Sequence, residues 1–205
     1  MGLPQPQNPY TVGEYLALER ESEERYEYLD GAIYAMAGES PEHGATCMNL
    51  SVIIGSQLQG TPCQAFAKDM KVRSGRLPLP GNPMKGLFSY PDLVVVCGAM
   101  QFHDQFRDVL LNPTVIIEVL SASIEVFDRG EKFRRYCAWL PTLKDSLLVA
   151  QDKPLFDHYH RLEENRWELI SLEGLAVSLH LESIHCALQL AEVYDLIAFH
   201  TDEPE

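Results

Sequence analysis

The chain has 205 residues, 46% of them hydrophobic, and a formal net charge of −14 at pH 7. This length suits one domain over 1–205, with a core at about 11–197, that buries enough apolar surface to fold without disulfides or structural metal. The sequence holds no apolar run of the ~20 residues that a membrane span needs, and residues 1–10 lack a signal-peptide pattern. We therefore expect a cytoplasmic protein with no membrane partner.

The cysteines are odd in number, widely spaced and without a CxxC pair. They are Cys47, Cys63, Cys97, Cys137 and Cys186. Disulfide and zinc frameworks use paired cysteines at characteristic spacings, so we expect reduced thiols here.

Charge is unevenly distributed along the chain. Acids dominate 14–42 and 152–205, whereas 68–85 and 128–135 are basic. The acidic total opposes DNA binding, because neutralisation of phosphates supplies most non-specific affinity. The basic segments still permit a local phosphate-binding surface. Its candidate nucleic-acid-binding residues are Lys68, Lys71, Arg73 and Arg129.

The first sixty residues predict two helices with a hairpin between them. Thr11, with Glu14 three residues on, forms a capping box and predicts a helix to about residue 24. The Asp-Gly pair at 30–31 predicts a hairpin over 26–36, because both positions of such a turn need positive φ. The Ser-Pro pair at 40–41 predicts a second helix that ends near residue 60.

The middle of the chain predicts strands. One covers about 64–72, and a long loop rich in proline and glycine follows over 74–89. The runs 92–96 and 114–120 are almost continuously apolar, which is typical of strands inside a sheet that is covered on both faces. The segment 98–112 between them is expected to be a loop or a hairpin arm.

The last third predicts a helix, four strands and a terminal helix. The first helix covers 127–139 and stops at Pro141. Short antiparallel strands are expected at 147–150, 155–161, 166–171 and 176–179, and the terminal helix at 188–197.

Two of these apolar strands carry an acid where an apolar residue would be less costly. Asp92 begins the first and Glu118 lies within the second. A carboxylate there is expensive unless something pairs with it. On neighbouring strands the two side chains could share an oxygen-ligated Mg²⁺ or Mn²⁺ ion. Such an ion lowers the pKa of a bound water, and Lys132 could stabilise the transition state of phosphate cleavage. Asp128 precedes Lys132 by four residues and shares its helix face.

The ordered motifs resemble the Uma2 family of restriction-endonuclease-like proteins, which is abundant in cyanobacteria. The matching segments are Pro91-Asp92, Ile117-Glu118-Val119-Leu120-Ser121, Asp128 with Lys132 and Tyr136, the hairpin 26–36, Pro41-Glu42-His43, and 141–159. The resemblance covers about 11–197. It implies an α/β (α+β) fold with a PD-(D/E)xK core: a mixed β-sheet with flanking helices, an N-terminal hairpin and C-terminal antiparallel strands. It also implies hydrolysis of DNA with a divalent metal.

One position departs from the general nuclease motif. Two residues after Glu118 stands Leu120 instead of lysine, and the resemblance implies that the lysine has moved to Lys132. This relocation requires the helix to pack across the strand ends beside Glu118. Glu27 and His43 resemble family positions near the site and, with Asp128, are possible additional site residues. The other histidines are expected at the surface.

The leading hypothesis is a Mg²⁺- or Mn²⁺-dependent DNA endonuclease. Asp92 and Glu118 are its metal ligands, and Lys132 completes the catalytic set. One alternative is a nuclease-fold interaction module that no longer cuts, which the acidic surface favours. Another is a hydrolase of a small phosphoester. For the endonuclease and for the interaction module we expect a homodimer.

Overall fold

The computed structural model describes residues 9–36, 38–75, 85–121 and 125–199. The helical segments are α1 (Val12–Glu21), α2 (Pro41–Gln57), α3 (Glu125–Phe127), the π-helical turn η1 (Asp128–Lys132), α4 (Phe133–Trp139) and α5 (Leu190–Val193). The first strands are β1 (Tyr26–Leu29), β2 (Ala32–Ala35), β3 (Cys63–Ala67), β4 (Lys71–Ser74), β5 (Leu87–Ser89), β6 (Leu93–Cys97) and β7 (Val109–Leu110). The others are β8 (Val115–Leu120), β9 (Asp145–Ala150), β10 (Leu155–Glu163), β11 (Arg166–Glu173), β12 (Ser178–Leu181) and β13 (Cys186–Gln189).

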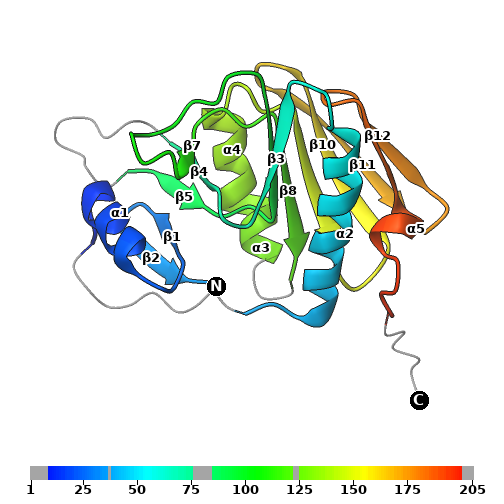
Figure 1. Cartoon of the computed structure of the whole chain (residues 1–205), viewed down its shortest axis with the longest axis horizontal. Helices are drawn as coiled ribbons and strands as arrows, with labels where there is room; N and C mark the ends of the chain where they lie inside the picture. Colours follow the sequence, from blue (N-terminus) through cyan, green and yellow to red (C-terminus); the bar gives the residue numbers. More distant parts are fainter. Residues whose placement is uncertain (1–8, 37, 76–84, 122–124, 200–205) are drawn as a thin grey trace.

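A six-stranded mixed sheet forms the centre of the described structure, in the order β11-β10-β9-β8-β6-β3. β8 and β9 are parallel, and the other neighbours are antiparallel. All of β8 and four residues of β6 are buried, which confirms the predicted interior strands. α2 and the β12–β13 hairpin pack on one face, against Ile117 among others, while Tyr136 of α4 packs on the other against Ile116 (Figure 1).

A second sheet, in the order β2-β1-β5-β4-β7, packs with α1. Tyr15 of α1 stacks on Tyr28 of β1 with ring centroids 5.0 Å apart, and both rings contact Phe88 of β5. All three side chains are fully buried. Aromatic pairs in such offset and edge geometries add to the stability gained from burial. This small core fixes β1, the strand that carries Glu27.

Local signals in the sequence account for the element boundaries in the N-terminal part. Thr11 and Glu14 form the predicted capping box, although α1 ends at residue 21. Asp30 and Gly31 have φ of 47° and 102°, as the predicted hairpin turn requires. Ser40 caps α2. These predictions are confirmed because each depends on residues within one turn of the chain.

Several predicted boundaries are wrong. The strand expected over 64–72 is split into β3 and β4, which belong to different sheets, because Lys68 adopts a φ of 55° that interrupts the extended backbone. β5 lies within the loop expected over 74–89, of which 76–84 lies outside the described residues. β9 pairs antiparallel with β10, as expected, but its pairing with β8 is parallel. β13 occupies the start of the segment expected as the terminal helix.

The cysteine prediction is wrong for one pair. Cys63 and Cys97 lie opposite each other on the antiparallel strands β3 and β6 and form a disulfide. Their Cα atoms are 3.9 Å apart, and 34 positions separate them in the sequence, so spacing alone gives no sign of the pair. Cys47, Cys137 and Cys186 are free thiols, as expected. Within the described residues, no helix is long and apolar enough to cross a membrane.

Candidate active site

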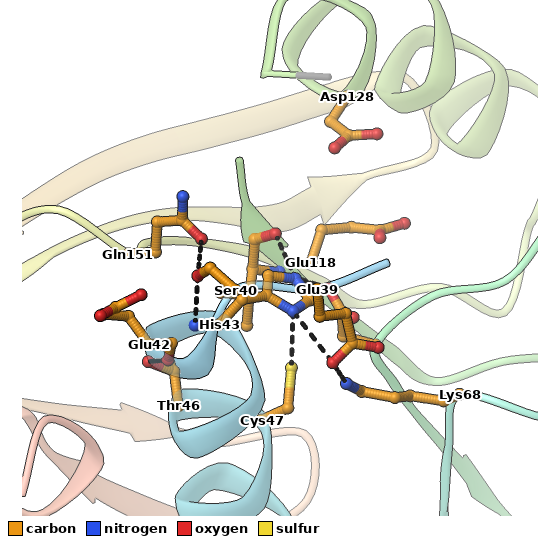
Figure 2. Close-up of polar contacts among 12 residues, drawn as sticks. Glu39, Ser40, Glu42, His43, Thr46, Cys47, Lys68, Glu118, Asp128 and Gln151 are labelled. Carbon is orange, nitrogen blue, oxygen red and sulfur yellow. Dashed lines mark hydrogen bonds and ion pairs between the residues drawn. The ribbon is translucent and has the colours of Figure 1, made fainter. Parts of the chain in front are cut away.

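A cavity of about 290 Å³ lies among the β1–β2 hairpin, the start of α2, the ends of β6 and β8, and η1. Every residue predicted as catalytic or as an additional site residue lines this cavity. They are Glu27, His43, Asp92, Glu118, Asp128 and Lys132. Figure 2 shows how three of them, His43, Glu118 and Asp128, come from different elements. The structure thus brings these side chains together, while their roles in catalysis stay predictions.

Strand register places the two acids beside each other. Leu93 of β6 pairs with Ile117 of β8. Asp92 precedes Leu93 and Glu118 follows Ile117, so the same antiparallel register sets them opposite each other. The backbone N–H of Val119 donates to Asp92 Oδ2 over 2.7 Å. This bond holds the Asp92 carboxylate at the end of the strand pair, facing the cavity.

Glu118 is 4% exposed, at the centre of the apolar strand β8. Its Oε1 lies 3.0 Å from Lys132 Nζ and accepts a hydrogen bond of 3.0 Å from the Tyr136 hydroxyl. Burial raises the pKa of Glu118 well above its usual range, and the nearby Asp128 adds to the rise while Lys132 opposes it. Lys132 thus offsets part of the cost of burying the Glu118 carboxylate.

Lys132 lies at the end of η1, the π-helical turn. Such turns are rare in helices and occur often at functional sites. The side chain is 3% exposed, and Nζ lies 3.0 Å from Glu118 Oε1 and 3.3 Å from both Glu27 Oε1 and Asp128 Oδ1. Burial lowers its pKa, but these carboxylates outweigh burial and hold the pKa of Lys132 well above its usual range. The helix therefore does pack with its lysine beside Glu118.

Glu27 and Asp128 complete the ring of acids around Lys132. Glu27 Oε1 accepts the backbone N–H of Tyr90 over 3.0 Å. Asp128 is 2% exposed, and within the described part of the chain neither of its oxygens accepts a hydrogen bond, although Lys132 lies at ion-pair distance. Burial raises the pKa of Asp128. These contacts show that one lysine leaves the acids of this cavity incompletely neutralised.

His43, in the first turn of α2, lies beside Asp92. Its Nε2 lies 3.1 Å from the carbonyl oxygen of Val119 and 3.4 Å from Asp92 Oδ2, and its Nδ1 lies 3.8 Å from Cys47 Sγ. Burial opposes a charge on the imidazole, but the hydrogen bonds to Asp92 and Cys47 raise the pKa of His43 to about 11. The charged imidazole in turn lowers the pKa of Asp92, against the effect of burial.

The donor set of the cavity fits a hard divalent cation. Five carboxylates line it, those of Glu27, Glu39, Asp92, Glu118 and Asp128. Mg²⁺ and Mn²⁺ prefer oxygen ligands, and carboxylates are the commonest of these in proteins. The unbonded oxygens of Asp128 show that the protein supplies more acceptors than donors here. Asp92 and Glu118 would hold the ion from adjacent strands.

The predicted nucleic-acid-binding cations do not form one exposed surface. Lys71 and Arg73 are each 3% exposed, so the prediction is wrong for these two, because the fold turns their strand inward. Lys68 pairs with Glu39. Arg129 pairs with Glu125 at 2.6 Å and also with Asp157. Both Lys68 and Arg129 keep part of their side chains exposed, and Lys68 lies beside the cavity through Glu39.

Sequence reasoning undervalued two residues near the site. Tyr136 is not among the predicted site residues, yet its hydroxyl binds both Glu118 and Ser89. Glu39 lines the cavity, with Oε2 at 3.4 Å from His43 Nδ1. Tyr136 lies four residues after Lys132, and this spacing indicates that both side chains lie on the same helix face. Glu39 lies in a loop and carries no such periodicity.

A mixed sheet that sets two acids opposite each other on adjacent strands, with a lysine on the next helix, defines a restriction-endonuclease-like protein of the α+β class. The chain belongs to the Uma2 family, whose model, described as "Putative restriction endonuclease", matches residues 12–192. A crystal structure from Anabaena variabilis, of a "putative nuclease belonging to DUF820", has the same fold. Its TM-score is 0.71 at 17% sequence identity, and the alignment covers 93% of this chain and 100% of that one. The predicted family and fold class are thereby confirmed.

Two proteins of Synechocystis sp. are similar along most of their length. The protein slr1290 is 32% identical over 186 residues, which cover 91% of this chain and 92% of that protein. The protein sll1609 is 30% identical over 164 residues, which cover 80% of this chain and 88% of that protein. Both are described as uncharacterized.

Proposed function

We propose that this protein is a Mg²⁺- or Mn²⁺-dependent endonuclease that hydrolyses phosphodiester bonds of DNA. The observation that carries the proposal is the convergence of Asp92, Glu118 and the buried Lys132 on one cavity. Membership of the Uma2 family supports the same reaction class. The donor set supports the metal, because the acids outnumber the buried lysine and hard divalent ions bind carboxylates.

The side chains have separable roles in this proposal. Asp92 and Glu118 would hold the Mg²⁺ or Mn²⁺ ion, which when bound would polarise a phosphoryl oxygen and lower the pKa of a bound water. Lys132, whose pKa lies well above its usual range, stays protonated and stabilises the negative charge that develops on the phosphate. His43 and the Val119 N–H orient Asp92. Tyr136 orients Glu118.

Charge explains why the metal is required for substrate binding. Phosphate is an anion, and the cavity holds more carboxylates than cations, so without a metal the two repel each other. Lys68 and Arg129, both partly exposed, are the cations that we propose for contact with the DNA backbone. A homodimer, in which each subunit would cut one strand, is part of the same proposal.

The test is cleavage of supercoiled plasmid DNA by the purified chain with Mn²⁺ or Mg²⁺, and with EDTA. We expect nicked or linear product only with metal. Asp92→Asn and Glu118→Gln, which keep the size of each side chain, should each lower the rate by at least ~100-fold, because each removes a metal ligand. Glu168→Gln, on the exposed surface of β11, is the matched control. Equal cleavage by all four proteins would overturn the assignment of Asp92 and Glu118 as metal ligands.

A second candidate is a hydrolase of a small phosphoester. The cavity volume of about 290 Å³ and the net charge of −14 favour it, because a small substrate needs no broad basic surface. Bis(p-nitrophenyl) phosphate, assayed in parallel, separates the two. Turnover of this diester without plasmid cleavage supports the second candidate. If neither substrate reacts and calorimetry detects no Mn²⁺ binding that depends on Asp92, the chain is an interaction module.

A further inference from the structure

A second group of metal-ligating side chains lies on the other face of the central sheet. Asp145 begins β9, and His158 and His160 lie two residues apart on β10, so the two imidazoles share one face of the sheet. His160 is the antiparallel partner of Asp145. One ligand atom from each of the three side chains lies within 4.8 Å of the other two. His158 is 5% exposed, contrary to the expectation that it lies at the surface.

The three side chains already meet at one carboxylate oxygen. His158 Nε2 lies 2.8 Å and His160 Nδ1 lies 2.7 Å from Asp145 Oδ1. Ser183, in the turn between β12 and β13, donates its hydroxyl to Asp145 Oδ2. Asp145 is fully buried, whereas the His160 side chain is 34% exposed. The group is therefore enclosed by the sheet and the hairpin, and it opens to solvent at His160.

The Asp145 carboxylate is buried at 0% exposure, and its oxygens lie at hydrogen-bond distance from His158, His160 and Ser183. Within the described ranges, its ion-pair partners are the two histidines and include no lysine or arginine. A buried carboxylate is stable only with a compensating cation, and a metal ion supplies one.

We propose that Asp145, His158 and His160 bind a divalent transition-metal ion of the Zn²⁺ type. Two imidazole nitrogens and one carboxylate oxygen form the ligand set of zinc sites that keep a further position open for water or another ligand. His160 marks where that position reaches solvent. Mg²⁺ avoids such a site because it prefers oxygen ligands, so this ion differs in class from the one proposed for the active site.

The geometry needs only a small adjustment. With metal–ligand bonds of ~2.0–2.1 Å, two ligands of a tetrahedral zinc ion lie about 3.3 Å apart. The imidazole nitrogens are 2.8 and 2.7 Å from Asp145 Oδ1. The ion would replace the shared protons, and each nitrogen would move away from the oxygen by about half an ångström. A rotation of the carboxylate or of the exposed His160 ring provides such a change.

This site is separate from the candidate active site. Asp145 pairs with Val115 at the start of β8, three residues before Glu118. Its side chain contacts Ser183 of the β12–β13 turn, whereas Glu118 contacts Lys132 and Tyr136 on the opposite face. Substitutions at one site therefore leave the ligands of the other in place, and the two proposals can fail independently.

Calorimetric titration with Zn²⁺ tests the proposal on the full chain after removal of metal with a chelator. The background protein carries Asp92→Asn and Glu118→Gln, which disable the candidate active site. We expect one Zn²⁺ per chain, and His160→Ala should raise the Kd by at least ~100-fold, since loss of a ligand exceeds the 10–100-fold effect of losing a partner of a ligand. His180→Ala is the matched control, because His180 is exposed and binds Glu182 outside the group.

A second variant and a spectroscopic probe identify which side chains bind the ion. Asp145→Asn keeps the side-chain shape and should also lose Zn²⁺ binding, with the folded state verified by circular dichroism. Co²⁺ in place of Zn²⁺ should give ligand-field bands without a sulfur-to-cobalt charge-transfer band. Such a sulfur band, lost in Cys47→Ser, would assign the ion to the thiol beside His43 and overturn the proposal. Absence of Zn²⁺ binding, or equal binding by His160→Ala, would leave a hydrogen-bonded cluster only.

Discussion

Lys71 and Lys132 are each 3% exposed, and each lies among carboxylates. Around Lys71 the charges are nearer to balance, because Lys71 and Arg20 together meet three acids, Glu19, Asp104 and Asp108. Lys71 pairs with Glu19 and, at 3.0 Å, with Asp108, while Arg20 binds both oxygens of Asp108. The face of the Tyr90 ring closes this cluster, with its centroid 5.4 Å from Lys71 Nζ. No residue of this cluster except Tyr90 lines the candidate active site.

Around Lys132 the charges are not matched. Its Nζ lies within 3.3 Å of three acids, one of which, Asp128, has oxygens without a hydrogen bond among the described residues. The group faces a cavity instead of an aromatic ring. Burial of a lysine is therefore not itself a sign of function. Surplus negative charge beside an accessible volume is the feature that separates a candidate active site from a structural ion-pair cluster.

Replacing Lys132 should give the largest effect on activity. Lys132→Met keeps the length of the side chain and removes the charge that faces the developing phosphate charge. We expect plasmid cleavage to fall by ~10²–10³-fold, the range measured when one transition-state stabilising group is removed. The rate is measured per folded protein, with the folded fraction taken from circular dichroism. Cleavage within twofold of the unmodified chain would exclude Lys132 from catalysis.

The same substitution at Lys71 should act on stability instead. Lys71→Met leaves Glu19 buried without its cation, and breaking a buried pair in this way costs about 3–5 kcal/mol. Urea unfolding measures the loss, and cleavage per folded protein should stay unchanged. Lys85→Met is the control, because its side chain is 59% exposed and its surface pair with Asp30 contributes about 0–1 kcal/mol. A stable Lys71→Met protein with lost activity would reverse the two assignments.

This contrast also marks the limit of sequence-based prediction. The sequence predicts the acids on the apolar strands, the lysine on the following helix and the hairpin turn, because periodicity and turn chemistry are local. The prediction that Lys71 belongs to a DNA-binding surface is wrong. Glu19, which pairs with Lys71, is 52 positions away in the sequence. No local pattern shows which charges a cation meets after folding.

The other wrong or missed predictions concern contacts that depend on which strands pair and in which register. Lys68 divides one apolar segment between two sheets through its backbone conformation, which no residue pattern encodes. Cys63 and Cys97 meet only because β3 and β6 are neighbours. His158 and His160 alternate along one strand in the sequence, but the position of Asp145 depends on the pairing of β9 with β10. Such contacts follow from topology and could not be read from spacing.

The smallest expected effect is on the pH dependence of stability, through Asp108 of the Lys71 cluster. Burial raises the pKa of Asp108, but the hydrogen bonds from Arg20 and Lys71 outweigh burial and lower it from 3.8 to about 2. Because the pKa is lower in the folded state, Asp108 stabilises the fold above pH ~4, and this contribution is lost as the pH falls towards ~2. Its side chain is 27% exposed, so solvent screening limits the contribution to about 1 kcal/mol.

Urea unfolding of the unmodified chain and Asp108→Asn, repeated between pH 7 and pH 2, measures this contribution. The difference in the free energy of unfolding between the two proteins should be largest at pH 7 and shrink towards pH 2, because protonated Asp108 resembles asparagine in charge. Other acids, such as Asp30 with its pKa of about 2, affect both proteins equally and cancel. A difference that stays constant with pH would mean that Asp108 acts through packing, and the charge matching around Lys71 would then lose its main support.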